Sequence, residues 1–502
     1  MALFDIAILF AASYLLVMRL HVIVALGERL ALALFAFFLL KGLAMFVLVA
    51  LGSTGLMEQT FVSVVFLGFS LVIQLSRSRS LVDVEPAKIV IASRSFKLKV
   101  ASVVAILFVA SLASALWFPV SAPDGIWYQV RAWDFLHESG FSATHTATQY
   151  RQYPPLVPLL FAWLESADWS LVKVLFPLTY LGLVVIIYYR LRETTCSEEL
   201  AGWMALVFAT TPYFWWHSQL GLLNLMSGVF FALGGLYWFT LVANWTDSES
   251  VETPLLPWAF VSGMSFGAAC WVRPEFVIYS GIALVLLMEL THRFPKNQHP
   301  DADNVFPVFA VSALALPTLW SSALLAVVAG VHSTGMAMIG MVFSGWILVL
   351  LWGMGWFRGS ARQLTVLVMV SVVGFVVLMF TGPQTSLTPL KAFALGFFRT
   401  FGFQVFFAFT FLLWAPALTA RWSRLAMAQR YLLLLLVSYL VVHMMMYTVL
   451  PIKSETAVQF FDNLMISPGN AVNSSDTREY LAWFPLFLFW VACLPKIKKA
   501  FR

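Results

Sequence analysis

Residues 100–118 read VASVVAILFVASLASALWF, an apolar stretch without a single charged side chain. An α-helix needs about 20 mainly apolar residues to cross a hydrocarbon core about 30 Å thick. Comparable stretches recur along all 502 residues, which are 61% hydrophobic and only 11% charged. A soluble protein carries roughly a quarter charged residues. The sequence therefore predicts an all-α protein that crosses a membrane many times.

The same composition excludes other classes of protein. A transmembrane β-barrel would alternate apolar and polar residues over about ten positions, and that pattern is absent. The net charge of +6 does not indicate nucleic-acid binding, because the 30 Lys and Arg residues are scattered singly among apolar segments. Cys196, Cys270 and Cys493 lie too far apart to indicate a disulfide framework or a thiolate zinc site. Residues 1–18 lack a basic start and a small-residue cleavage site, so we expect a first spanning helix there.

Hydropathy predicts about 13 to 15 transmembrane helices. The predicted spans are 1–18, 30–50, 57–75, 100–118, 169–189, 200–215, 217–243, 258–272, 275–291, 305–330, 331–356, 364–381, 394–417, 431–450 and 481–495. They divide the chain into three regions. Residues 1–99 hold extra N-terminal helices and a basic loop, 100–300 a core with a long loop at 119–168, and 301–502 the remaining helices with a second long loop at 451–480.

The basic residues between these spans predict their orientation, because Lys and Arg near helix ends are retained on the cytoplasmic side. One set of alternate loops carries most of the Lys and Arg residues, whereas the acids divide almost evenly. The opposite set of loops holds only Arg131, Arg151, Arg273, Lys391, Arg399, Lys453 and Arg478. Lys41 and Lys173 fall within predicted spans. This asymmetry predicts a cytoplasmic C-terminus, an N-terminus outside, and the two long loops outside.

The first long loop contains a predicted amphipathic helix. Residues 121–140 read SAPDGIWYQVRAWDFLHESG, in which Ile126, Val130 and Trp133 repeat at helical spacing. We expect this helix to lie on the outer membrane surface, with Asp124 near its N-cap. Further along, TQYRQYPPLVP at 148–158 leads into an apolar stretch that is too short to span and is predicted to lie along the surface.

A carboxylate just after a spanning helix, an interfacial helix and then Tyr153-Pro154-Pro155-Leu156 together resemble the first extracytoplasmic loop of GT-C fold glycosyltransferases. The branch most similar comprises protein O-mannosyltransferases and lipid A aminoarabinose transferases. The resemblance covers about residues 117–290 and implies a GT-C-like core. It also implies an enzyme that moves a sugar from a polyprenyl-phosphate carrier to a hydroxyl or similar acceptor outside the membrane.

The resemblance implies roles for individual residues. Asp124 matches the family's catalytic acid by its position after the helix, and Arg151 stands where some relatives place a basic residue. Displacing a lipid phosphate from a sugar needs a carboxylate to accept the acceptor's proton and cations to hold the phosphate. The chain departs from the family in two respects. Adjacent acids are missing beside Asp124, and three spans precede the helix that corresponds to the family's first.

Other charged and aromatic residues predicted outside are further candidates for binding carrier phosphate or sugar. These are Arg273, Glu275, Tyr153, His145, His217, Lys453 and Arg478. Arg273 and Glu275 lie between apolar spans, where an ionisable pair is costly unless it is paired or faces a wet cavity. A salt-bridged hairpin would also explain them. Trp215 and Trp216 are expected in the interfacial aromatic belt.

Some of these residues also have purely structural interpretations. Asp124 could serve only as an N-cap. Asp134 and Glu138 could supply a second acid, but a solvated helix face with Arg131 pairing to Asp134 is favoured. No HxxxH motif or group of His and Asp residues indicates a metal site, so no cofactor is assigned, and a divalent metal stays an open alternative without a ligand cluster to support it.

We therefore expect a multi-pass membrane glycosyltransferase of a bacterial or archaeal plasma membrane, with its active site facing outside. Its partners would be a polyprenyl-phosphate-linked sugar, a glycan, lipid or protein acceptor, and membrane lipid, but no nucleic acid. A lipid-linked glycan polymerase or ligase is the alternative, and its chemistry would centre on Arg and His. A secondary transporter is a weaker alternative, because few charges and no internal repeat are found in the spans.

Overall fold

The computed structural model describes residues 1–23, 25–76, 89–138, 140–141, 145–246, 254–293, 301–327, 333–354, 420–449 and 480–501. In these ranges the chain is helical and forms no strand, apart from one isolated bridge between Val90 and Ser197. The helices are α1 (Ala2–Met18), α2 (Leu26–Leu51), α3 (Leu56–Leu75), α4 (Arg94–Trp117), α5 (Pro123–His137), α6 (Thr148–Arg151), α7 (Leu156–Glu165), η1 (Trp169–Val174), α8 (Leu175–Thr195), α9 (Glu198–Thr210), α10 (Pro212–His217), α11 (Leu223–Thr246), α12 (Leu256–Val272), α13 (Phe276–Arg293), α14 (Ala302–Val327), α15 (Ser333–Gly353), η3 (Trp422–Arg424), α19 (Met427–Val449), α23 (Tyr480–Ala492) and α24 (Pro495–Ala500).

Within the described ranges, 7 helical segments are long and apolar enough to cross a membrane. They are α2, α3, α4, the continuous η1–α8 segment, α11, α14 and α15. This confirms the prediction of an all-α, multi-pass membrane protein. The predicted spans at 364–381 and 394–417, and almost all of the loop at 451–480, lie outside the described residues.

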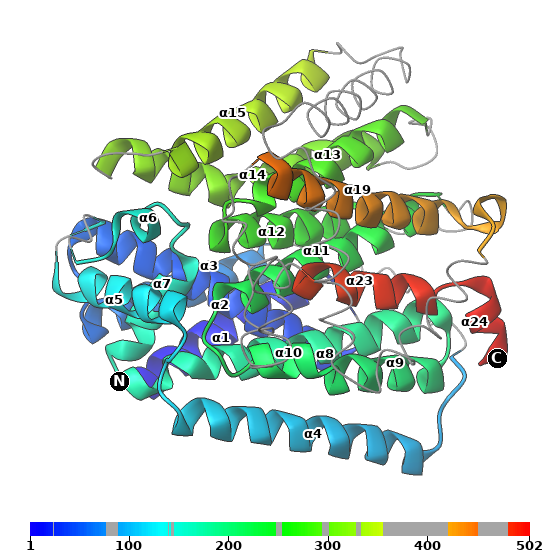
Figure 1. The fold of residues 1–502 in the computed structure, drawn as a ribbon, viewed down its shortest axis with the longest axis horizontal. Coiled ribbons are helices and arrows are strands. Elements are labelled where there is room, and N and C mark those ends of the chain that lie inside the picture. Colours follow the sequence, from blue (N-terminus) through cyan, green and yellow to red (C-terminus); the bar gives the residue numbers. More distant parts are fainter. Residues whose placement is uncertain are drawn as a thin grey trace.

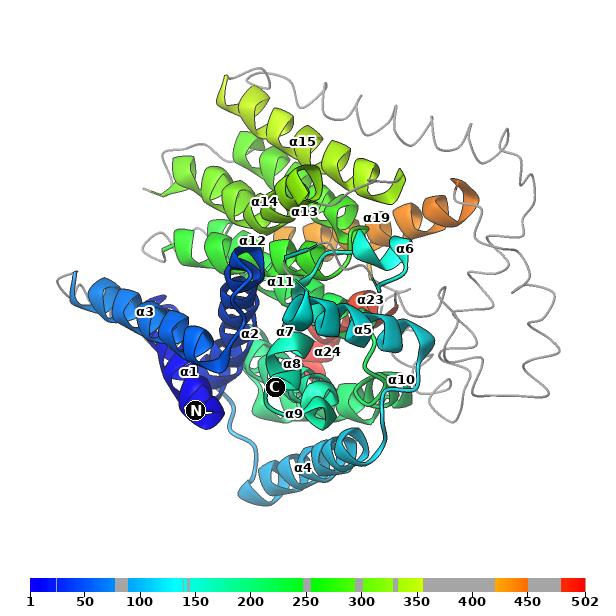
Figure 2. The same cartoon turned by 90° about the vertical axis from the view of Figure 1, so that its left-hand side faces the viewer.

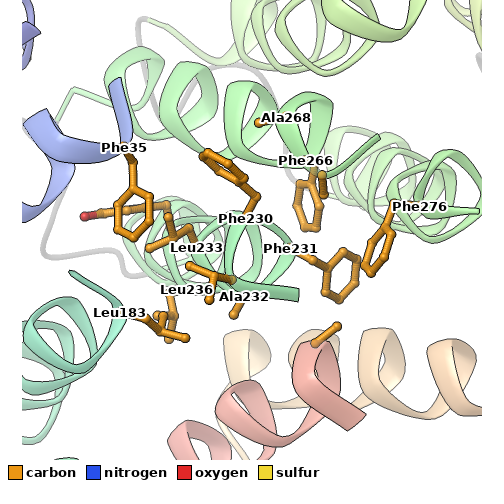
Figure 3. Close-up of a cluster of buried hydrophobic side chains, with 14 of the residues drawn as sticks. Phe35, Leu183, Phe230, Phe231, Ala232, Leu233, Leu236, Phe266, Ala268 and Phe276 are labelled. Atoms are coloured by element: carbon orange, nitrogen blue, oxygen red, sulfur yellow. The ribbon is translucent and has the colours of Figure 1, made fainter. Parts of the chain in front are cut away.

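Helix α11 forms the centre of the bundle. It packs against α8, α12, α19 and α23, and its side chains are buried along most of its length (Figure 1). Figure 3 shows Phe230 and Phe231 of α11 among Phe35 of α2, Phe266 of α12 and Phe276 of α13. The rings of Phe35 and Phe230 meet edge to face with centroids 5.6 Å apart, a favourable aromatic geometry.

A buried ion pair connects the N-terminal helices. Lys41 of α2 lies 2.6 Å from Asp5 of α1, and Ser63 of α3 donates a 2.5 Å hydrogen bond to the same carboxylate. Lys41 also lies over the Trp163 ring of α7, 5.4 Å from its centroid. A charge inside a membrane is costly unless it is paired, so these contacts hold α1, α2 and α3 against one another and against the rest of the bundle. Figure 2 shows the three helices grouped on one side.

Basic residues gather at one end of the bundle. There Arg190 lies 2.6 Å from Glu28, Lys97 lies 3.0 Å from Glu198, and Lys498 donates a 2.8 Å hydrogen bond to the Thr194 carbonyl. We call this the basic end. Figure 1 shows α24 at this end and α5, α6 and α7 at the opposite end, which we call the loop end. For the loops that lie in the described ranges, the two ends correspond to the two sets that the sequence distinguishes.

Candidate functional site

Helix α5 turns its polar side chains inward. Asp124, Tyr128, Arg131 and Asp134 recur at a spacing of three or four residues and therefore share one helix face. Tyr128, Arg131 and Asp134 are buried. Ile126 and Trp133, by contrast, are each 45% exposed. The helix is amphipathic, as predicted: Ile126 and Trp133 lie on its exposed side, while Tyr128, Arg131 and Asp134 lie on its buried side.

Two expectations about this loop are wrong. The stretch that was expected along the surface is α7, and its residues from Leu156 to Leu164 are buried. It is apolar on every side and packs against α2, α5, η1 and α12, so no face remains for solvent. Asp134, which was expected on a solvated helix face, is 0% exposed. It is buried because the chain from residue 145 onward folds back over α5.

Asp124 is engaged by a residue from outside its own helix. It lies in the first turn of α5, whose N-cap is Ala122, so Asp124 is not itself the N-cap. Instead the Tyr150 hydroxyl donates a 2.7 Å hydrogen bond to Asp124 Oδ1. The Tyr150 ring stacks on Trp127 with centroids 5.8 Å apart and meets Tyr128 nearly at right angles. Two aromatic residues of α5 thus hold the ring that positions the carboxylate.

Gly125 permits the close approach of another segment beside this carboxylate. A Cβ at position 125 would lie 2.8 Å from Val120 Cγ1 and 3.2 Å from the Gly221 carbonyl oxygen. Gly221 has a φ of 73°, in the left-handed region, and follows α10. A side chain at residue 125 would therefore push the turn after α10 away from the start of α5.

Arg273 and Asp124 act on the same side chain, Tyr128. Burial raises the pKa of the Tyr128 hydroxyl well above its usual value of 10.0, and the charges of Tyr153 and Asp124 raise it further. Arg273 opposes them and lowers that pKa. Both the carboxylate and the guanidinium are therefore close enough to Tyr128 to influence its ionisation. Arg273 also forms an ion pair with Glu275, and both side chains are largely buried.

Arg131 fixes the backbone of the segment that carries Tyr150. Its Nη1 donates hydrogen bonds of 3.0 Å to the Tyr150 carbonyl and 2.7 Å to the Tyr153 carbonyl. The guanidinium also lies about 5 Å from the ring centroids of Phe135 and Trp320. Arg131 was expected to pair with Asp134, but its main contacts are these carbonyls and rings. The charge of Asp134 acts on Arg131 by raising the pKa of the guanidinium. Its role as a backbone clamp was not predicted, because it depends on a segment about 20 residues away.

Asp134, Glu138 and His145 lie together at the far end of α5. His145 Nδ1 is 2.9 Å from Asp134 Oδ1 and 3.0 Å from Glu138 Oε1. The other oxygen of Asp134 accepts hydrogen bonds of 3.0 Å from the Thr146 amide and 2.6 Å from its hydroxyl. The structure thus brings together a group of His and acidic residues that the sequence did not indicate. The acids at i and i+4 were visible in the sequence, but the turn that brings His145 back to them was not.

The remaining predicted residues have other surroundings. Arg151 donates a 2.6 Å hydrogen bond from Nε to the Thr146 carbonyl. His217 is fully buried in α10, with Nδ1 3.0 Å from the Tyr213 carbonyl. Trp215 donates to the Leu107 carbonyl of α4 at 3.1 Å, so it packs into the bundle, whereas Trp216 is exposed. Lys453 and Arg478 lie outside the described residues.

A cavity of about 170 Å³ lies between the end of α4, α5 and η1. Its lining includes Trp117, Gln129, Trp169 and Lys173. Lys173, which the sequence placed within a span, donates to the carbonyls of Phe118 and Pro119 at 3.1 and 3.4 Å.

Glu165, at the end of α7, lies near Gln129 of that cavity. Burial raises the pKa of the Glu165 carboxyl to about 7, and the neighbouring Gln129 side chain lowers it by less. Gln129 lies on a different face of α5 from Asp124, so this polar contact is separate from the Tyr150–Asp124 contact.

Comparison with known proteins yields no match to a family model, a curated protein or a solved structure.

Proposed function

We propose that the protein is a GT-C-type membrane glycosyltransferase that moves a sugar from a polyprenyl-phosphate carrier to an acceptor at the loop end of the bundle. The observation that supports this proposal is that other side chains hold both groups in place: the Asp124 carboxylate accepts a 2.7 Å hydrogen bond from Tyr150, and the Arg273 guanidinium pairs with Glu275. A carboxylate and a guanidinium are the two groups that such a transfer requires, and here they come from α5 and from the turn between α12 and α13.

Each residue has a defined part in this chemistry. Asp124 accepts the proton of the acceptor hydroxyl while the acceptor oxygen bonds to the anomeric carbon. The bond from that carbon to the phosphate oxygen breaks, and the electron pair leaves with the polyprenyl phosphate. Arg273 stabilises the phosphate as its negative charge grows. Glu275, which pairs with Arg273, orients the guanidinium. Tyr150 keeps the Asp124 carboxylate pointed away from its own helix.

The distribution of basic residues supports placing this site on the non-cytoplasmic side. The basic end carries the contacts of Arg190, Lys97 and Lys498, and cytoplasmic loops are enriched in such residues. The loop end, with Asp124, is opposite (Figure 1). The apolar tail of the carrier would then remain in the membrane beside the bundle, while its phosphate reaches Arg273 at the loop end.

The experiment uses membranes that contain the full chain and a radiolabelled polyprenyl-phosphate sugar. Asp124→Asn removes the base with little change in volume, and we expect sugar transfer to fall by about a hundredfold or more, within the range of general base catalysis. Asp168→Asn is the matched control, because Asp168 is an exposed acid at the same end of the bundle and Asn can also serve as its N-cap.

Unchanged transfer by Asp124→Asn would remove this residue from the reaction. If activity then required Arg273 and His145, the lipid-linked glycan polymerase or ligase would become the better assignment. Transport is disfavoured by the charges buried in the spans, because Asp5 with Lys41 and Glu28 with Arg190 are paired with each other.

A further inference from the structure

Three side chains of the loop form a donor set suited to a divalent cation. Asp134 and Glu138 stand one turn apart on α5 and its C-cap, and His145 returns to them from the following segment. One oxygen from each carboxylate and one imidazole nitrogen all lie within 4.8 Å of one another. We propose that Asp134, Glu138 and His145 bind a divalent transition-metal ion, of which Zn²⁺ and Mn²⁺ are the candidates.

The distances fit direct coordination. Ligand atoms about 2.1 Å from an ion lie about 3.0 Å from each other in octahedral geometry and about 3.4 Å in tetrahedral geometry. His145 Nδ1 lies 2.9 Å from Asp134 Oδ1 and 3.0 Å from Glu138 Oε1. His145 Nδ1 carries at most one hydrogen, so it can form a good hydrogen bond to only one of these two carboxylate oxygens. A cation between the three atoms interacts favourably with all of them at once.

The surroundings orient the buried ligand. Asp134 is 0% exposed, and its Oδ2 is held by the amide and the hydroxyl of Thr146. Its Oδ1 is thereby directed toward His145. Supporting hydrogen bonds of this kind fix the orientation of carboxylate ligands in metal sites. Three protein ligands also leave positions for water, as in many exchangeable or catalytic sites.

The chemistry of the donors selects the class of ion. Imidazole together with carboxylate suits Zn²⁺ and other first-row transition ions, whereas Ca²⁺ and Mg²⁺ prefer oxygen ligands alone. Two carboxylates and one neutral imidazole balance the +2 charge of the ion.

Such an ion would position residues of the loop without taking part in bond making. Asp124 and Asp134 are about 15 Å apart along α5, from the helical rise of about 1.5 Å per residue. The ion would join the end of α5 to Thr146, whose carbonyl accepts the Arg151 hydrogen bond. The next helix, α6, carries Tyr150, which bonds to Asp124. The ion would therefore steady the segment that positions the carboxylate.

The test is metal binding by the purified full-length protein in detergent, prepared with an affinity tag that contains no histidine. After chelator treatment and removal of the chelator, ZnCl₂ or MnCl₂ is titrated and the bound metal is measured by calorimetry and elemental analysis. We expect one equivalent in the wild type, and binding at least tenfold weaker in His145→Ala and in Glu138→Gln. Both side chains are partly exposed, at 60% and 20%, so these variants should still fold, which size-exclusion elution and melting temperature verify.

His137→Ala is the matched control. His137 is also exposed and on α5, but its Nδ1 faces the Trp133 carbonyl at 3.0 Å. It should bind metal like the wild type. Absence of a saturable equivalent in the wild type, or unchanged affinity in folded His145→Ala, would overturn the proposal and leave a hydrogen-bonded His–carboxylate cluster. The measurement needs no sugar transfer, so it stands apart from the proposed enzymatic activity.

Discussion

The Tyr150 hydroxyl donates a 2.7 Å hydrogen bond to Asp124 Oδ1, and this contact joins α5 to a helix 26 positions later in the chain. Arg131 reinforces it by holding the carbonyls of Tyr150 and Tyr153. The orientation of the candidate base is therefore determined by the segment 148–153 as much as by α5. A change that leaves Asp124 itself untouched can alter its chemistry.

Tyr150→Phe removes this hydrogen bond and keeps the ring that stacks on Trp127. Hydrogen bonds to charged groups are worth about 1.5–3 kcal/mol, so we expect kcat/KM for sugar transfer to fall about tenfold or more. Tyr14→Phe in α1 is the control for loss of a hydroxyl. A transfer rate equal to that of the wild type would show that Tyr150 does not position the base.

Arg273→Gln should weaken binding of the carrier phosphate. Because the guanidinium is proposed to stabilise charge that grows during the reaction, we expect a higher KM for the lipid-linked sugar together with a lower kcat, measured in steady-state assays. Arg293→Gln is the control, since Arg293 pairs with Glu289 on the same helix, α13, but at its other end. An increase in KM with unchanged kcat would restrict Arg273 to ground-state binding.

Glu165→Gln should change how stability depends on pH. Burial raises the pKa of the Glu165 carboxyl from 4.5 to about 7. Below about pH 4.5 the carboxyl is neutral in both the folded and unfolded states, and its burial carries no charge penalty. Between about 4.5 and 7 the unfolded chain loses its proton first, so the free energy of unfolding falls as pH rises. Above pH 7 the carboxyl is charged in both states, and burying its charge lowers the free energy of unfolding by a constant amount. That amount is no more than about 2 kcal/mol for this partly exposed group.

The measurement is the melting temperature in detergent at pH 5 and pH 8. Glu165→Gln should melt close to the wild type at pH 5 and above it at pH 8. Glu199→Gln, at an exposed position, corrects for the general effect of removing one charge. A difference between Glu165→Gln and the wild type that is the same at both pH values would contradict this account.

The Asp5–Lys41 pair predicts a non-additive response to substitution. Removing one partner leaves a buried charge uncompensated, which costs about 3–5 kcal/mol, so Asp5→Leu and Lys41→Met should each lower the melting temperature strongly. The double variant should be more stable than either single variant, because no buried charge remains. Additive losses in this cycle would show that the two side chains do not interact.

Accessibility to a membrane-impermeant thiol reagent tests the sidedness of the bundle. In a chain with its three native cysteines replaced by Ser, Asp168→Cys should be labelled in intact cells, and Lys499→Cys only after permeabilisation. Both positions are exposed, at the loop end and the basic end respectively. The reverse pattern would place the loop end in the cytoplasm.

The sequence predicted the helical segments of the described chain well, because membrane spans are defined by long apolar runs that need no tertiary information. The run at 100–118 lies almost entirely within α4, and the predicted 258–272 span matches α12. Where a run contained a break, the prediction was less accurate. Pro212 divides the predicted span at 200–215 into α9 and α10, consistent with the preference of Pro for the first turn of a helix.

The site was less predictable, because its contacts depend on how segments fold back on one another. The positions of Asp124 and Arg273 could be proposed from local pattern and charge. The burial of Asp134 and the return of His145 could not, since both depend on the path of the chain after α5. The prediction that α7 lies along the surface was wrong. It rested on the helix being too short to span a membrane, but α7 is apolar on all sides and is therefore buried.

The ion pair between Asp5 and Lys41 also has a consequence for biogenesis. Asp5 in α1 and Lys41 in α2 lie in consecutive apolar helices, and Ser63 of α3 completes the contact. An unpaired charge is costly in lipid, so we expect α1 alone to insert poorly into the membrane. The three helices should therefore leave the translocon as a group, with the first helix retained until the second and third have been synthesised.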